Sequence, residues 1–189
     1  MRGGMICVVL SAGISERFGE DKVLVELCGR TLIERVVDVA MKFGKVRVVV
    51  NPKNRGEISR ILEDVEIVVN ESYEDGISTS IKKGIDGVDD DVLVFLADMP
   101  LLKVEDVERF LEVASRSASP IVFPRWNGKK GFPTLIRKEA LRYAEFLEGD
   151  EGFRRICRDF KICEGVEIEG EGFYTDIDTI EDLRRIRGC

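Results

Sequence analysis

The chain has 189 residues, 44% hydrophobic and 34% charged, which suits a soluble globular protein with one core and a single domain over residues 1–189. Its 29 Lys and Arg residues against 36 Asp and Glu give a net charge of −7, which argues against a nucleic-acid-binding surface. The chain has no histidine, which excludes Ser-His and Cys-His nucleophilic catalysis and leaves chemistry to carboxylates, cations and a metal ion.

The sequence predicts neither a membrane-spanning segment nor a secretion signal. Its longest apolar runs, residues 5–10 and 92–97, fall far short of the roughly 20 residues that a membrane-spanning helix needs, and no small-residue cleavage site follows the first run. We therefore expect a cytoplasmic protein without a membrane or nucleic-acid partner. The cysteines form no CxxC pair and no zinc site, so we expect them to be reduced and mostly structural; they are Cys7, Cys28, Cys157, Cys163 and Cys189.

The chain opens with a predicted buried strand at residues 6–10, which runs into a loop of small residues at 11–13. In such a loop, backbone N–H groups can approach an anion closely. Arg17 and Lys22 follow at fixed distances, so the segment suits a triphosphate. It is not a Walker A loop, because five residues separate its two glycines and the lysine comes three residues later; the dinucleotide fingerprint GxGxxG is also missing.

The next elements alternate between helix and strand. A core-facing helix is expected over residues 31–44 and a short one over 58–62, with strands at 46–50 and 65–69. This order is typical of a parallel sheet with helices on its faces. Ligands of such sheets bind beyond the carboxyl ends of the strands, where the small-residue loop lies. The first half is therefore expected to be a Rossmann-like nucleotide-binding unit.

Two segments in the middle of the chain carry candidate binding groups. In residues 71–84, Ser78 and Ser80 either cap a helix or line a nucleotide pocket. Asp98 follows the apolar strand expected at 92–97, where an uncompensated carboxylate would be costly to desolvate. Bound Mg²⁺ would compensate it, since this ion takes one or two carboxylates together with phosphate oxygens and waters. The alternative is that Asp98 only caps the following loop.

Two segments in the second half could contact an anionic ligand. One is a hairpin of strands expected at 120–124 and 132–136, whose basic turn is either solvated or in contact with the anion. That turn carries Arg125, Lys129 and Lys130. In the other segment, Gly149 would end one helix and Asp150 would cap the next. Arg154, on the first turns of that helix, could hold a phosphate group through two hydrogen bonds.

Near the C-terminus, strand-like alternation puts Asp176 and Asp178 on the same face of an extended stretch. Two converging carboxylates indicate a metal site, with Asp178 as the second Mg²⁺ ligand beside Asp98 and with Asp176 nearby. Thr179 and Asp182 form a capping pattern that predicts a final helix.

Five of these segments, in this order, resemble the motifs of the MobA-like nucleotidyltransferases, most closely the molybdenum cofactor cytidylyltransferases. They are SAGxSxRFGxxK at 11–22, GxSxSxxxG at 76–84, DMP at 98–100, GDxGxR at 149–154 and DIDTxEDL at 176–183. Two positions depart from the family pattern. Ile180 replaces a proline, a small change at a helix start. Phe132 replaces the histidine of a Gly-His-Pro segment, which leaves the identity of the acceptor open.

The resemblance implies an α/β fold, a Rossmann-like three-layer α/β/α sandwich of the nucleotide-diphospho-sugar transferase type, with a mostly parallel sheet and a small inserted hairpin. It implies Mg²⁺-dependent transfer of a nucleoside monophosphate from a nucleoside triphosphate to the phosphate of a molybdopterin-type cofactor, with release of pyrophosphate and a molybdoenzyme as receiver of the product. The phosphate is already ionised at neutral pH, so the reaction needs positioning and charge stabilisation rather than a base. The implied site residues are Arg17, Lys22 and Asp98 for catalysis; Leu10, Ser11, Ala12, Gly13, Arg17, Lys22, Ser78 and Ser80 for the nucleotide; Asp98 and Asp178 for the metal; and Lys130, Asp150 and Arg154 for the acceptor.

The nucleotide base is predicted from one position. Ser11-Ala12-Gly13 follows the LAAG pattern of the cytidylyltransferases rather than the LAGG pattern of the guanylyltransferases. The methyl group of Ala12 would narrow the pocket floor, so CTP is favoured over GTP. The alternatives are a guanylyltransferase or a sugar- or cobinamide-phosphate nucleotidyltransferase of the same fold, and a non-catalytic protein that binds the cofactor. A Rossmann-like oxidoreductase is disfavoured because the dinucleotide fingerprint is missing.

Overall fold

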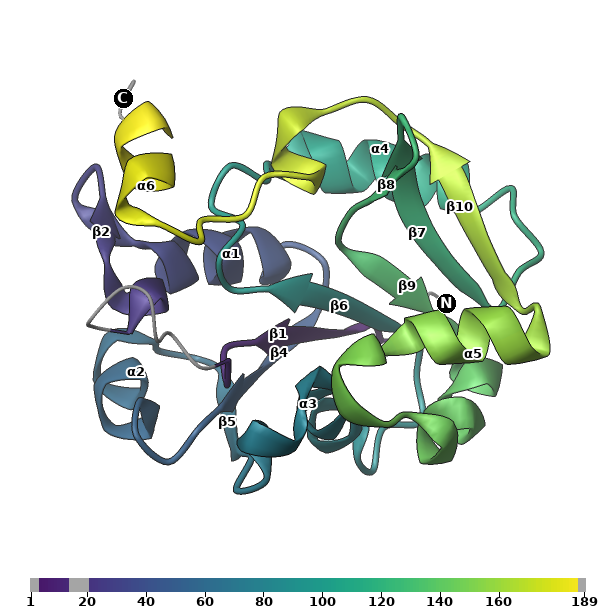
Figure 1. Ribbon diagram of the computed structural model, residues 1–189, viewed down its shortest axis with the longest axis horizontal. Coiled ribbons are helices and arrows are strands. Elements are labelled where there is room, and N and C mark those ends of the chain that lie inside the picture. Colours follow the sequence, from purple (N-terminus) through teal and green to yellow (C-terminus); the bar gives the residue numbers. More distant parts are fainter. Residues whose placement is uncertain (1–3, 14–20, 187–189) are drawn as a thin grey trace.

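One mixed sheet of eight strands organises the protein, whose computed structural model describes residues 4–13 and 21–186 (Figure 1). The strand order is β10-β7-β9-β6-β1-β4-β5, and β8 pairs with β7. The central strand β1 runs parallel to both of its neighbours, β4 and β6, and β5 runs parallel to β4. These four strands are β1 (Ile6–Leu10), β4 (Lys45–Val50), β5 (Glu66–Val69) and β6 (Val92–Leu96). The predicted parallel half of the sheet is confirmed.

The other half of the sheet contains the inserted hairpin. Strand β9 (Thr134–Ile136) runs antiparallel to β6 and to β7 (Ile121–Trp126), and β10 (Cys163–Glu167) runs parallel to β7. Much of the expected basic turn is strand, because β7 continues to Trp126 and pairs with β8 (Lys129–Lys130). The turn itself is Asn127-Gly128, with both φ angles positive, the residue pair that two-residue hairpins favour.

Helices cover both faces of the sheet, so the predicted three-layer arrangement is confirmed (Figure 1). Side chains alternate along β1: Cys7 and Val9 pack on the face with α1, α2 and α4, and Val8 and Leu10 pack on the face with α3, α5 and the 3₁₀ segment η3. The helical elements are α1 (Leu32–Ala40), α2 (Arg55–Ile61), α3 (Ile77–Ile85), α4 (Val104–Ala114), η3 (Lys138–Phe146), α5 (Phe153–Phe160) and α6 (Ile180–Ile186). Within the described ranges, no helix is long and apolar enough to cross a membrane.

Both predicted capping patterns are present. The Thr31 hydroxyl accepts a hydrogen bond from Glu34 N at 3.3 Å, and Glu34 Oε2 accepts one from Thr31 N at 2.8 Å. Asp182 Oδ2 likewise accepts from Thr179 N at 2.9 Å, and the Thr179 hydroxyl accepts from Asp182 N at 3.1 Å. The second box fixes the start of α6 at Ile180, two residues after Asp178, so local sequence determines where the chain turns beside the candidate metal ligand.

Between the first loop and α1 the chain is more regular than a simple loop. The 3₁₀ turn η1 (Lys22–Leu24) leads into a two-stranded ribbon of β2 (Glu26–Leu27) and β3 (Arg30–Thr31). Further 3₁₀ turns are η2 (Tyr73–Asp75), η4 (Gly149–Glu151) and η5 (Glu171–Phe173). η1 places Lys22 at the edge of the sheet where β1 and β6 end.

Candidate active site

Three segments far apart in the sequence meet at the carboxyl edge of β1 and β6. Ala97 N donates a hydrogen bond to Leu10 O at 3.1 Å, and Ile177 N donates one to Asp98 O at 2.9 Å. The C-terminal segment is anchored by a small apolar cluster, which consists of Leu27, Leu32, Ile177 and Leu183. Asp176 and Asp178 flank the buried Ile177 and are both exposed, as strand-like alternation predicts. The end of β6 and the approach to α6 therefore present their carboxylates at one place.

Lys22 lies between two of these carboxylates. Its Nζ is 2.6 Å from Asp98 Oδ2 and 2.8 Å from Asp178 Oδ1. The side chains of Lys22 and Asp98 are each 18% exposed, and that of Asp178 is 53% exposed. The structure thus brings together three residues that sequence analysis assigned to catalysis and metal binding. Arg17, the fourth, lies outside the described residues.

The pKa values of Lys22 and Asp98 reflect burial and mutual attraction. Burial lowers the pKa of the Lys22 ammonium, but the attraction of Asp98 and Asp178 outweighs this effect and raises its pKa overall. Burial raises the pKa of the Asp98 carboxyl; Lys22 opposes this shift, and the negative charges of Asp176 and Asp178 add to it. Burial is therefore the main cause of the raised Asp98 pKa, and an additional cation beside this carboxylate would favour its charged form.

The donor set at this edge fits a divalent metal ion. Asp98 Oδ1 is buried and has no hydrogen-bond partner among the residues that the structure describes. A buried carboxylate oxygen without a partner is costly unless a cation or water satisfies it. No group of three or more metal-binding side chains occurs in the described ranges. Asp98 and Asp178 could supply two of the oxygen ligands of a divalent metal ion.

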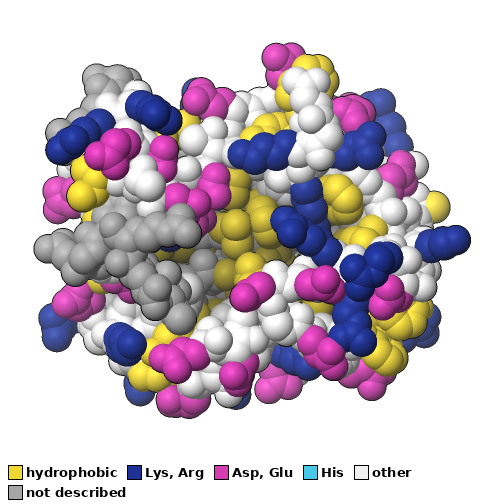
Figure 2. All heavy atoms as spheres, viewed as in Figure 1, with side chains coloured by type: hydrophobic (Ala, Val, Ile, Leu, Met, Phe, Trp, Pro, Cys, Tyr) yellow, Lys and Arg dark blue, Asp and Glu magenta, His cyan; other side chains and the backbone are white. Residues whose placement is uncertain are grey.

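A cavity of about 350 Å³ opens beside these residues. Figure 2 shows a hollow on this face, with hydrophobic side chains inside it and Lys and Arg side chains beside it. On the β1 side the cavity is lined by Leu10, Ser11, Ala12, Gly13, Lys22, Val23, Leu96 and Asp98; on the α3 side it is lined by Tyr73, Glu74, Gly76, Ile77, Ser80 and Asp150. Most of the predicted nucleotide contacts therefore share one cavity. Ser78 does not line it and is buried in α3 instead.

Three buried asparagines, which sequence analysis did not single out, support this cavity. Asn54 Nδ2 donates to Ser11 O at 2.8 Å and to Asp21 Oδ2 at 2.6 Å, and Asn51 Nδ2 donates to Ala12 O at 3.5 Å. On the other side, Asn70 Nδ2 donates to the hydroxyls of Thr79 at 2.8 Å and Ser80 at 2.9 Å. The signal was available in the sequence: Asn51 and Asn70 each directly follow an apolar strand, at the edge where ligands bind.

Lys130 and Arg154 form a cationic pair on the α5 side of the hollow. The Lys130 Nζ lies 4.3 Å from the centre of the Phe123 ring. Burial, reinforced by the positive charge of Arg154, lowers the pKa of Lys130 to about 8. Neither side chain has an ion pair or hydrogen bond with a described residue, whereas Arg125 on the same hairpin pairs with Glu167 at 2.9 Å. Two adjacent cations without a carboxylate suit an anionic ligand.

Asp150, the third predicted acceptor residue, occupies a different place. The expectation that Asp150 caps the following helix is wrong: α5 begins after Gly152 with no side-chain cap, and Asp150 Oδ1 accepts a hydrogen bond from Ile77 N at 3.3 Å. Gly149 does not end a helix either, since η3 ends at Phe146 and Gly149 starts η4. A tertiary contact explains why Asp150 does not cap α5. The first turn of α3 lies against this segment, and its Ile77 N–H binds the carboxylate that would otherwise cap α5.

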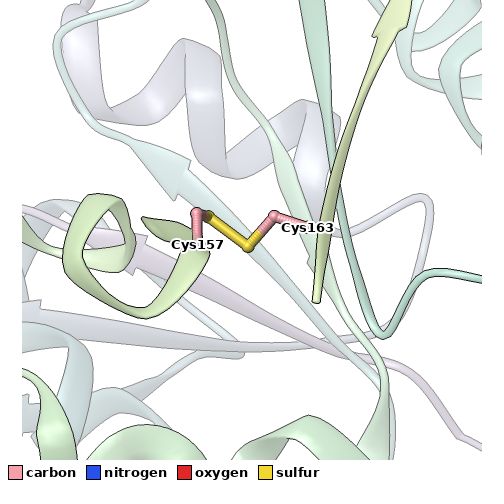
Figure 3. Close-up of a disulfide and its surroundings, with 2 residues drawn as sticks. All are labelled: Cys157 and Cys163. Carbon is pink, nitrogen blue, oxygen red and sulfur yellow. A yellow bond between two sulfur atoms is a disulfide. The ribbon is translucent and has the colours of Figure 1, made fainter. Parts of the chain in front are cut away.

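The expectation that all cysteines are reduced is also wrong. A disulfide joins Cys157 on α5 to Cys163 at the start of β10 (Figure 3). The chain reverses between these elements and brings the two Cα atoms to 5.1 Å, within the range a disulfide requires. Cys28 is disulfide-bonded as well. Cys7 is a free thiol, and burial raises its pKa to about 12. The first bridge ties the helix that carries Arg154 to the edge of the sheet.

Comparison with known proteins identifies the family. The model of the MobA-like NTP transferase domain matches residues 7–165. The chain belongs to the MobA-like NTP transferase family. This nucleotidyltransferase is 32% identical over 188 residues to a probable molybdenum cofactor guanylyltransferase of Aquifex aeolicus, covering 95% of this chain and 89% of the relative. It is 25% identical over 183 residues to the molybdenum cofactor cytidylyltransferase of Escherichia coli, covering 94% and 92%.

The fold of this MobA-like transferase also matches solved structures. The crystal structure of Rv0371c from Mycobacterium tuberculosis superposes with a TM-score of 0.84 at 21% identity, over 100% of both chains. The predicted fold class and the predicted family are thus confirmed. The relatives' names divide between guanylyl and cytidylyl transfer, so they do not select a base.

Proposed function

We propose that this nucleotidyltransferase transfers a nucleoside monophosphate, with CMP favoured, from a nucleoside triphosphate to the phosphate of a molybdopterin-type cofactor. The observation that carries the proposal is the contact of Lys22 with Asp98 and Asp178 beside a cavity that is lined by the 11–13 loop. This arrangement supports binding of a triphosphate at one end of the cavity and of its base toward α3. The relatives' names supply the acceptor class.

In the proposed reaction, an acceptor phosphate oxygen attacks the α-phosphorus of the nucleotide. The bond from that phosphorus to the bridging oxygen breaks, and pyrophosphate leaves with the electron pair. The chain's own residues position and neutralise charge, since the ionised phosphate needs no base. Lys22 would leave its carboxylate partners in part to contact phosphate oxygens, and the amides near Ala12 and Gly13 would hold the triphosphate. Mg²⁺, held by Asp98 and Asp178, would neutralise charge on the phosphates.

The acceptor phosphate would bind between Lys130 and Arg154. Both cations lie without a described counter-ion on the same face of the sheet as the cavity. An anion there would restore the charge balance that burial of Lys130 disturbs. Phe123, beneath Lys130, adds an apolar surface suited to a ring system.

Guanylyl transfer is the second candidate. Ala12 is 2% exposed and lines the cavity, which supports the smaller cytosine base. The relative with 32% identity, however, is named a guanylyltransferase. Competition between CTP and GTP for the same protein decides between these two.

The test is product formation with purified protein, Mg²⁺, molybdopterin, and either CTP or GTP. We expect release of pyrophosphate and a dinucleotide product detectable by mass spectrometry, faster with CTP. Asp98→Asn should reduce the rate at least 100-fold, because it removes a charged ligand of the Mg²⁺ that neutralises the phosphates. Asp89→Asn is the matched control: Asp89 precedes the opposite end of β6 and pairs only with the exposed Lys138 among described residues. Equal rates for wild type and Asp98→Asn, or no product with either nucleotide, would refute the proposal.

A further inference from the structure

The segment Gly149–Arg154 contacts both sides of the candidate site. Arg154 lies beside Lys130, whereas Asp150 lines the cavity on the α3 side, four residues earlier in the chain. Asp150 Oδ1 accepts a hydrogen bond from Ile77 N, 73 residues away in the sequence, and no described hydrogen bond uses its other oxygen. One short segment therefore joins the two substrate regions.

Helix α3 lacks a capping side chain of its own. It begins after Gly76, whose φ is +102°, and a glycine cannot satisfy the free N–H groups of the first turn. Asp150 supplies the missing acceptor from outside the helix through its Oδ1. The position of the first turn of α3 therefore depends on Asp150.

The backbones of the two segments approach each other closely at Gly76. A Cβ atom on Gly76 would lie 2.4 Å from the carbonyl carbon of Gly149 and 2.7 Å from Asp150 Oδ1. Gly152 also lies against α3, since a Cβ atom there would lie 3.5 Å from the side chains of Ile77 and Ile81. A displacement of the 149–152 backbone would thus move the start of α3, and with it the cavity wall.

The part of α3 that Asp150 holds is the part that lines the cavity. Ile77 and Ser80 both face it, and the Ser80 hydroxyl is oriented by Asn70 at 2.9 Å. We infer that Asp150 is a positioning residue of the nucleotide site, which fixes the first turn of α3 against the nucleotide, rather than a contact for the acceptor. The inference rests on the proposed function, because its effect is measured as nucleotide binding.

Three substitutions separate this role from an acceptor role. Asp150→Ala removes the hydrogen-bond acceptor. Asp150→Asn keeps an oxygen at the same distance from the backbone but removes the charge. Asp150→Glu keeps the charge and moves it by one methylene. A capping acceptor should be rescued by asparagine, a good helix cap, whereas a charge that meets the acceptor or a cation should be rescued by glutamate.

The experiment is calorimetric titration of each variant with CTP and with GTP in the presence of Mg²⁺ and without acceptor. For the nucleotide that wild type prefers, we expect Asp150→Ala to raise Kd about tenfold, the size expected for a lost helix cap, and Asp150→Asn to stay within about twofold of wild type. Glu151→Ala is the matched control, since Glu151 is the next residue and pairs with the exposed Arg158. In steady-state kinetics, Asp150→Ala should raise the nucleotide KM more than Asp150→Asn does, and the acceptor KM should stay constant in both variants.

The outcomes distinguish failure of the positioning role of Asp150 from failure of the proposed function. Wild-type binding that Asp150→Ala leaves unchanged, or rescue by glutamate rather than asparagine, would overturn the positioning role alone. No binding of either nucleotide to wild-type protein would overturn the proposed function and this role with it. A melting curve of each variant shows whether it is folded, and Asp150→Asn keeps the test decisive if the alanine variant unfolds.

Discussion

Replacing Lys130 by methionine should stabilise the protein while weakening its use of the acceptor. Burial and the charge of Arg154 lower the pKa of Lys130 from 10.5 to about 8. At neutral pH, a lowering of that size corresponds to a cost of about 3 kcal/mol for keeping the ammonium charged in the folded protein. Methionine has a similar length and can stay in contact with the Phe123 ring, so Lys130→Met should recover most of this cost.

The predicted effect is an increase in melting temperature of roughly 5 to 10 °C at pH 7, from the size scaling of unfolding entropy. The sign depends on pH. The cost is fully present below pH 8, and it disappears as pH rises toward the unfolded value of 10.5. The gain from Lys130→Met should therefore shrink between these values. Differential scanning calorimetry from pH 7 to 10 measures it.

Lys129→Met is the control, because Lys129 is exposed on the same hairpin and donates a hydrogen bond to Tyr174 O. Lys129→Met should leave the melting temperature unchanged or lower it slightly. In the acceptor assay, Lys130→Met should raise the acceptor KM and leave the nucleotide Kd unchanged. A melting temperature at or below that of wild type for Lys130→Met would refute the reasoning about the unpaired cation.

Four further predictions follow from the geometry. Asn70→Ala should raise the nucleotide Kd several-fold in titration calorimetry, because it leaves Ser80 without its orienting donor; an unchanged Kd would remove Asn70 from the site. Gly84→Ala should destabilise the protein by about 1–3 kcal/mol in urea unfolding, since a Cβ atom there would lie 2.4 Å from Val8 Cγ1; equal stability would contradict the close approach of α3 to β1. Replacing Cys157 and Cys163 together by serine should cost about 2 kcal/mol, and an unchanged melting temperature under non-reducing conditions would show that the bridge contributes nothing. The acceptor KM of wild type should rise as pH increases through about 8, because Lys130 then loses its charge, and a flat profile would exclude Lys130 from acceptor binding.

The sequence predicted those parts of the site that follow from strand ends. A buried strand ending in small residues, an apolar strand ending in Asp98, and alternation around Ile177 each place a group at the carboxyl edge by local rules. The contacts of Lys22 were not predictable in this way. They span 76 and 156 residues, and the position of η1 depends on packing that no local pattern records.

The wrong predictions for Asp150 and for the cysteines have the same cause, because both depend on tertiary packing. Asp150 has the right neighbours in sequence to cap α5, but the first turn of α3 lies against it and takes its oxygen. Cys157 and Cys163 show no motif, and only the reversal from α5 into β10 brings them together. The hairpin turn, in contrast, could have been predicted from sequence. Asn127-Gly128 is a strong local signal for a two-residue turn, so the two strands on either side of it could have been extended up to these residues.

The most direct measurement is the melting temperature of wild type and Asp98→Asn with saturating CTP or GTP, with and without Mg²⁺. A ligand at 100 times its Kd stabilises the native state by about 2.7 kcal/mol, a rise of several degrees for a chain of this size. The account predicts such a rise for wild type with nucleotide and Mg²⁺ together, and its loss in Asp98→Asn. A rise that is independent of Mg²⁺ and equal in both proteins, or no rise with either nucleotide, would contradict the assignment of this edge as the nucleotide and metal site.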